Sequence, residues 1–121
     1  MELFFVGAGG ILGSLARYQL GKAVTEKSRT TFPVGTFIIN ITGAILLGLI
    51  SGLDVSKNMY LLLGDGFLGA YTTFSTFMYE GFNLFQGKEK LNAFTYILGS
   101  LFLGIIGYVL GFELGKAVKI I

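Results

Sequence analysis

The side chains that could do chemistry in this sequence are mostly neutral hydroxyl and amide groups set inside apolar stretches. The clearest group is the run Thr72-Thr73-Phe74-Ser75-Thr76-Phe77, where pairs of hydroxyls are separated by aromatic rings. Hydroxyls donate hydrogen bonds without carrying a fixed charge, and the edge of a phenyl ring is electropositive. Such groups can replace the water around a small anion and still bind it weakly enough for release. Phe74 and Phe77 could equally be packing residues.

Three more polar residues lie on apolar segments at helical spacing. Asn40 precedes Ala44 by one helical turn, on a face of small residues. A buried amide costs a few kcal/mol unless it is satisfied, so Asn40 either bridges helices or faces a pore. Tyr96 and Ser100 share a face at i, i+4 and could form a polar stripe, although Tyr96 could also anchor the chain at a membrane interface.

The sequence contains no constellation that supports catalysis. It has neither His nor Cys, which removes the commonest general base and the usual metal-binding side chains. Ser75 has no neighbouring base, and the glycine-rich stretch 7–13 lies within an apolar run rather than after a strand. Asp65 and Glu80 are the only acids inside the apolar segments, and they are too far apart in sequence to suggest a pair. Scattered basic residues and a net charge of +2 give no indication of nucleic-acid binding.

Composition places the chain among membrane proteins. Of its 121 residues, 53% are hydrophobic and only 13% are charged, which is typical of a chain that spans a bilayer. Its length fits one domain, residues 1–121. We expect an all-α integral membrane protein with four transmembrane segments, at about 3–20, 34–53, 59–85 and 91–112. Polar connections, the first from 22 to 31, separate them.

The third segment is anomalous. A continuous helix of its length would measure roughly 40 Å, against a hydrocarbon core of about 30 Å. Its centre, 69–77, is rich in Gly, Thr and Ser and is a poor helix sequence. A straight tilted helix remains an alternative. We favour a helix broken near mid-membrane, because non-helical backbone at that depth usually lines a cavity or an ion site.

Loop charges give almost no orientation signal. With four spans, one side carries three basic residues and the other side carries five. These are Lys57, Lys116 and Lys119 against Lys22, Lys27, Arg29, Lys88 and Lys90. Either copies insert both ways up and pair antiparallel, or the chain has one orientation with weak signals. Small residues at every fourth position, such as Gly107, Gly111 and Gly115, predict close helix packing, and four short helices predict an oligomer.

Three motifs resemble the signature of the Fluc/CrcB fluoride channels, over essentially the whole chain. They are Gly13-x-x-x-Arg17-Tyr18, Pro33-x-Gly35-Thr36-x-x-x-Asn40-x-x-Gly43, and Gly66-Phe67-x-Gly69-x-x-Thr72-Thr73-Phe74-Ser75-Thr76-Phe77. The resemblance implies a dual-topology antiparallel homodimer with two fluoride pores, in a multi-pass cell membrane protein. It also implies passive fluoride export that lowers fluoride toxicity in the cytoplasm.

The resemblance carries roles to individual positions. It implies a fluoride pathway formed by Asn40, Phe74, Ser75, Thr76, Phe77, Tyr96 and Ser100. It places Arg17, Thr36 and Glu80 around the aqueous vestibules. The carbonyl groups of Gly69 and Thr72 are expected to bind one structural sodium ion between the two subunits. Three features depart from the family pattern: Asp65, Gly104 after the polar stripe, and Gly-Ala-Tyr in place of Gly-Gly-aromatic.

Three alternatives follow from these observations. A heterodimer of two paralogues is one, although the presence of Asn40, Phe74 and Phe77 favours a homodimer. A small four-helix proton-coupled multidrug exporter is another; such exporters use a membrane-embedded Glu in the first helix, where this chain has only Arg17 as a charge. The third is a non-transporting assembly subunit.

Overall fold

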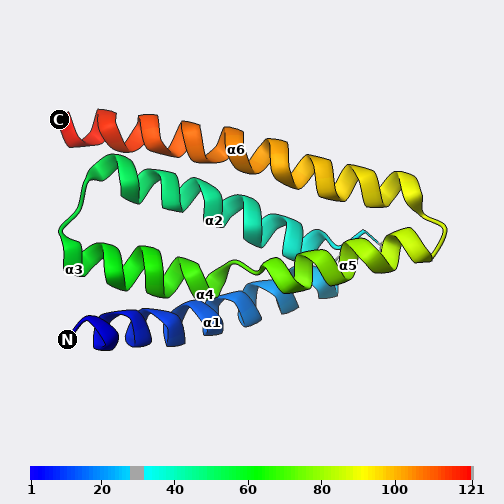
Figure 1. The fold of residues 1–121 in the computed structure, drawn as a ribbon, viewed down its shortest axis with the longest axis horizontal. Coiled ribbons are helices and arrows are strands. Elements are labelled where there is room, and N and C mark those ends of the chain that lie inside the picture. Colours follow the sequence, from blue (N-terminus) through cyan, green and yellow to red (C-terminus); the bar gives the residue numbers. More distant parts are fainter. Residues whose placement is uncertain (28–31, 121) are drawn as a thin grey trace.

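The computed structural model describes residues 1–27 and 32–120, and its regular elements there are all helices. Figure 1 shows four helical rods side by side, with both chain termini at the same end. The first rod is α1 (Glu2–Lys27), the second is α2 (Val34–Leu53) and the last is α6 (Lys90–Ile120). The third rod consists of four elements in succession: α3 (Lys57–Tyr60), η1 (Leu61–Leu68), α4 (Gly69–Tyr71) and α5 (Phe74–Gln86).

Helices α1 and α6 are longer than the apolar segments that predict them, whereas α2 matches its segment. The polar stretch expected from residue 22 begins inside α1, which continues to Lys27, and α6 continues eight residues past Phe112 to Ile120. The helices extend past the apolar runs because Ala, Lys and Glu are good helix formers. Arg29, one of the residues in the charge comparison, lies outside the described residues.

The third rod changes its backbone geometry twice. Residues of η1 form a π-helix, a rare geometry that is often found near functional sites. The helical path then stops at Thr72 and Thr73, whose backbones are extended, with ψ angles of 159° and 121°. Helix α5 restarts at Phe74, where the Thr73 hydroxyl accepts a hydrogen bond from the Thr76 N–H at 3.3 Å. The interruption lies within the Gly-, Thr- and Ser-rich centre of the segment.

Glycines bring α2 and α6 into backbone contact. A Cβ atom added at Gly48 would meet the Tyr108 carbonyl oxygen, and one added at Gly111 would meet the Ile45 carbonyl oxygen. The close approach predicted from the glycine spacing is therefore present. A similar contact joins α1 to η1, where Gly9 faces the main chain of Leu62. Small residues allow this approach where apolar burial alone cannot distinguish protein from lipid.

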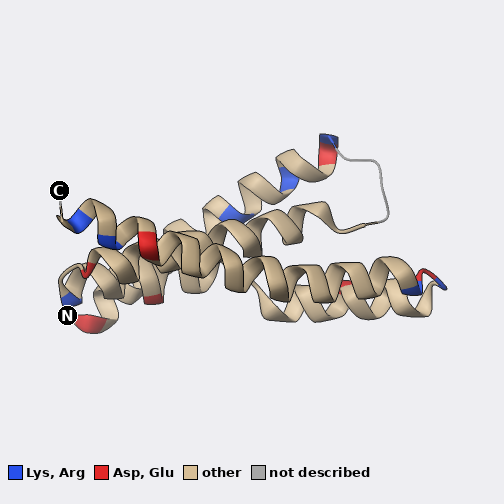
Figure 2. Ribbon diagram, turned by 90° about the horizontal axis from the view of Figure 1, so that it is seen from above, with Lys and Arg blue, Asp and Glu red and all other residues tan. Residues whose placement is uncertain are grey.

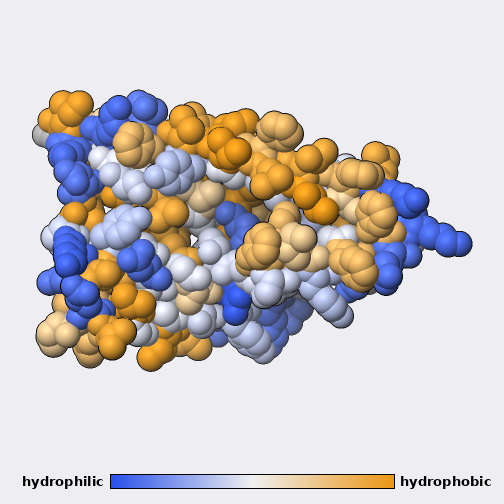
Figure 3. All heavy atoms as spheres, viewed as in Figure 1, coloured by the Kyte–Doolittle hydropathy of each residue, from blue (hydrophilic) through white to orange (hydrophobic). Residues whose placement is uncertain are grey.

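The outer surface is suited to a lipid environment. Among the described helices, α2 and α6 are long and apolar enough to cross a membrane. Figure 2 shows charged residues gathered toward the ends of the rods, and Figure 3 shows the same grouping of hydrophilic atoms on one face. Large apolar side chains are exposed along α6, including Phe102, Ile105, Val109 and Leu110. A water-soluble monomer rarely exposes so continuous an apolar surface.

Candidate functional site

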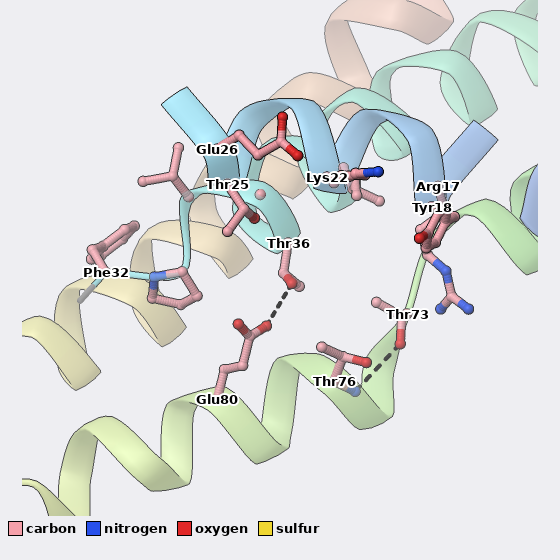
Figure 4. Close-up of a pocket in the computed structure, with 15 residues that line it drawn as sticks. Arg17, Tyr18, Lys22, Thr25, Glu26, Phe32, Thr36, Thr73, Thr76 and Glu80 are labelled. Carbon is pink, nitrogen blue, oxygen red and sulfur yellow. Dashed lines mark hydrogen bonds between the residues drawn. The ribbon is translucent and has the colours of Figure 1, made fainter. Parts of the chain in front are cut away.

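A cavity of about 540 Å³ lies between α1, the start of α2 and α5 (Figure 4). It brings together the three residues predicted for the vestibule, Arg17, Thr36 and Glu80, together with Thr76 from the predicted pathway. The other charged side chains of its wall are Lys22 and Glu26, both from α1. The cavity therefore carries charges of both signs and can hold water and attract small ions.

Glu80 is tied to α2 across this cavity. The Thr36 hydroxyl donates a hydrogen bond of 2.5 Å to Oε1 of Glu80, as Figure 4 shows. A hydrogen bond to an ionised carboxylate is short and roughly twice as strong as a neutral one. This bond fixes α5 against the first turn of α2. The elements that carry Asn40 and the residues from Phe74 to Phe77 are thereby held together.

Tyr96 lies fully buried beside these residues, with no exposed surface. Its ring packs against Phe77 with centroids 5.1 Å apart, and against Phe32 at 5.5 Å. The Thr36 hydroxyl and the Glu80 carboxyl group lie close to its hydroxyl, although neither meets hydrogen-bond geometry with it. Such burial does not fit the alternative that Tyr96 is an interfacial anchor.

Two buried hydroxyl groups of α6 are unsatisfied. Within the described ranges, neither the Tyr96 hydroxyl nor the Ser100 hydroxyl has a hydrogen-bond partner. A buried polar group without a partner costs about 1–3 kcal/mol. Native proteins retain such a group where water, an ion or a functional role accounts for it. A role for these two hydroxyls in a polar stripe stays a prediction.

A smaller hollow of about 190 Å³ lies at the interruption of the third rod. It is lined by Asn40, Thr72, Thr73, Phe74 and Phe77. Phe77 is buried and Phe74 is 75% exposed, with ring centroids 6.3 Å apart. Thr73 also lines the larger cavity, so this residue borders both spaces. Ser75, by contrast, is exposed and lines neither space.

Asn40 forms a two-bond ring with the backbone of Thr73. Its Nδ2 donates to the Thr73 carbonyl oxygen at 3.1 Å, and its Oδ1 accepts from the Thr73 N–H at 3.0 Å. The amide therefore bridges two rods and also lines the smaller hollow. The predicted helix bridge is therefore present, whereas the alternative that Asn40 faces a pore stays a prediction.

These bonds leave particular carbonyl groups without their usual helical donors. In a continuous helix the Thr73 N–H would bond to the Gly69 carbonyl, but it is used by Asn40. The Thr76 N–H would bond to the Thr72 carbonyl, but it is used by the Thr73 hydroxyl. Main-chain carbonyl oxygens are suitable ligands for a hard cation. The described residues contain no group of three or more acidic side chains that could hold a metal ion.

The role of Asp65, a departure from the family pattern, was not explained by the sequence. Asp65 is exposed on η1, one turn before Gly69, and lines a hollow of about 440 Å³ that also contains Asn40, Gly69 and Thr72. Asp65 therefore borders the same space as Gly69 and Thr72. The residue that sequence reasoning missed is Thr73. It lines both the larger cavity and the smaller hollow, and its backbone forms two hydrogen bonds with the Asn40 amide. Its place between the two predicted residues Thr72 and Phe74 was the available signal.

The fold and site define a small helical membrane-type protein with polar hollows at an interrupted helix. The chain belongs to the CrcB family: the model described as CrcB-like protein, Camphor Resistance (CrcB), matches residues 4–112. A protein of Clostridium acetobutylicum named fluoride-specific ion channel FluC 2 is 57% identical over 92% of this chain and 95% of its own. A Bacillus cereus protein with the same name is 44% identical, over 95% and 98%. A Carboxydothermus hydrogenoformans protein named fluoride-specific ion channel FluC 1 is 37% identical, over 98% and 97%.

Proposed function

We propose that this protein is a fluoride-selective ion channel that exports fluoride passively and lowers its toxicity in the cytoplasm. Family membership and the names of the similar proteins support the assignment. The structural observation that carries it is the smaller hollow, lined by neutral polar residues and two phenyl rings, beside a larger charged cavity with which it shares Thr73. Fluoride binds water tightly, so a route across the membrane must supply replacement donors.

The proposed pathway begins in the larger cavity, with Arg17, Thr36 and Glu80 around the vestibule. It continues past the hydroxyls of Thr76, Tyr96 and Ser100. It then reaches the hollow bounded by Asn40, Phe74 and Phe77. Ser75, which is exposed and lines neither space, is kept as a proposed member of the pathway. The hydroxyls and the amide donate charge-assisted hydrogen bonds, and the phenyl edges present positive potential. The smaller hollow is lined without a Lys or Arg, which would bind the anion too firmly for release.

The assembly that we propose is a dual-topology, antiparallel homodimer with two pores. Four spans place both termini on one side, and the interruption at Thr72 and Thr73 then lies near mid-membrane. The almost balanced loop charges support insertion in both orientations. The similar proteins named FluC 1 and FluC 2 suggest paralogues, so a heterodimer is the second arrangement to test. We further propose that it is a multi-pass protein of the cell membrane.

A structural sodium ion is part of the proposal. The carbonyls of Gly69 and Thr72, released from helical hydrogen bonds, would hold it at the interruption, where it would link the two subunits. The ion is structural and is not transported.

An exporter mechanism finds no support in the family or in the names of the similar proteins. In α1 the acids are Glu2 and Glu26, one at each end of the helix rather than in its apolar centre. The proton-binding carboxylate that a coupled exporter requires is therefore missing from that helix.

The test is fluoride efflux from liposomes that contain the purified protein, with chloride as the comparison anion. We expect rapid fluoride release and little chloride release. Phe77→Ile should cut fluoride flux because it removes the phenyl edge, while size-exclusion chromatography should show an unchanged assembly. Equal rates for the two anions, or no flux of either from the wild-type protein, would overturn the assignment.

A further inference from the structure

The amide of Asn40 has a fixed orientation. The Thr73 N–H can only donate and the Thr73 carbonyl can only accept, so their bonds at 3.0 and 3.1 Å determine which amide atom is oxygen and which is nitrogen. An Asn side chain has two N–H groups, and the ring with Thr73 uses one of them. Asn40 lines the hollow beside Phe74 and Phe77, and its second N–H has no hydrogen bond to another described residue.

The same ring controls the carbonyl groups at the interruption. Because Asn40 takes the Thr73 N–H, the Gly69 carbonyl loses its helical partner. If Asn40 were removed, the Thr73 N–H would be left unsatisfied, and returning to the Gly69 carbonyl would be its nearest remedy. Helical geometry would then extend toward Thr73 and remove a carbonyl from the cation-binding set. The one side chain therefore lines the hollow beside Phe74 and Phe77 and also takes the N–H that the Gly69 carbonyl would otherwise accept from.

We propose that Asn40 is a positioning residue that couples the cation site to the anion pathway, through its two-bond ring with Thr73. The ring releases the Gly69 carbonyl for the cation and at the same time aims the remaining amide N–H at the anion. The proposal rests on the proposed function. It goes beyond that function because it assigns Asn40 a second role at the cation carbonyls and makes the two sites depend on one another.

Two substitutions at Asn40 separate these roles. Asn40→Leu has a similar volume and can form neither bond of the ring, so it should lose both sodium binding and fluoride conduction. Asn40→Asp behaves differently, because the Thr73 carbonyl beside the new carboxyl group can accept a hydrogen bond only from its neutral form and so favours that form. A neutral carboxyl accepts from the Thr73 N–H and donates to the Thr73 carbonyl, which reproduces the ring. It has no further hydrogen to offer an anion.

Thr42→Val is the matched control on the same helix. Its hydroxyl is 2.9 Å from the Tyr71 hydroxyl, so it also joins α2 to the third rod, but it does not contact Thr73. The measurement is the unfolding temperature of purified protein in sodium chloride against choline chloride, alongside fluoride efflux. A ligand that binds only the folded state raises that temperature. Circular dichroism checks that each variant retains its helices.

We expect a sodium-dependent rise in unfolding temperature for wild type, Thr42→Val and Asn40→Asp, and none for Asn40→Leu. Fluoride efflux should fall at least tenfold in both Asn40 variants. A full sodium response in Asn40→Leu, or a lost response in Asn40→Asp with retained helicity, would overturn the coupling. Both outcomes can occur with normal wild-type fluoride flux, so they are distinct from failure of the proposed function. Absence of a sodium response in the wild type would also overturn it.

Discussion

Replacing Tyr96 by Phe should make the protein more stable and a poorer channel. The Tyr96 side chain has no exposed surface, and among the described residues its hydroxyl has no hydrogen-bond partner. The ring contacts with Phe32 and Phe77 depend on the aromatic body, which Phe retains. Removing only the unsatisfied hydroxyl should therefore raise the free energy of unfolding by about 1–3 kcal/mol.

Conduction should change in the opposite direction. If the Tyr96 hydroxyl donates to a passing anion, the variant loses a charge-assisted hydrogen bond of about 1.5–3 kcal/mol. Since about 1.4 kcal/mol corresponds to a factor of ten in rate, fluoride efflux should fall roughly tenfold or more. The paired assays are chemical unfolding in mixed micelles and fluoride efflux from liposomes.

Tyr108→Phe is the control for the chemical change. Tyr108 lies on the same helix and is 37% exposed, so the loss of its hydroxyl should alter neither quantity. The reasoning fails if Tyr96→Phe is clearly less stable than wild type, because its hydroxyl would then have a structural partner. Unchanged fluoride flux with increased stability would remove Tyr96 from the pathway.

Two further predictions concern packing and pH. Gly111→Ala should lower the free energy of unfolding by about 1–3 kcal/mol, because the new methyl group meets the Ile45 carbonyl oxygen of α2. Gly104→Ala has open space around it and should be tolerated in the same unfolding assay; equal losses in both variants would show that α2 and α6 are not in close contact. A hydrogen bond and the positive charge of Lys119, 2.9 Å away, lower the pKa of Asp54. The pair therefore adds stability above the usual Asp pKa, and this contribution is lost as the pH falls through the lowered value. Lys119→Met should remove this dependence of the free energy of unfolding on pH below about pH 4. At neutral pH the variant should differ little in stability, since the pair is exposed. Unfolding measured across pH tests this, and an undiminished loss of stability in acid would contradict it.

Residue types and spacing were sufficient to predict the helical class and the four apolar segments. They also predicted where helices would approach closely, because a Gly at every fourth position leaves a continuous strip without side chains on one helix face. The poor helix sequence at 69–77 marked the region in which the structure has its interruption. The family resemblance supplied the candidate residues Asn40, Phe74 and Phe77.

Only the tertiary structure decided how these residues meet. Asn40 and Thr73 are 33 positions apart. No local sequence pattern predicts that the Asn40 side-chain amide would form hydrogen bonds with both the N–H and the carbonyl of Thr73. The same holds for Thr36 and Glu80, whose hydrogen bond spans 44 positions. The apolar pattern also did not predict where α1 and α6 end, because residues with high helix propensity extend both helices past their hydrophobic parts. Sequence periodicity reports which face of a helix is apolar, whereas a contact between two rods depends on their relative rotation and height, and these are set by packing across the whole bundle.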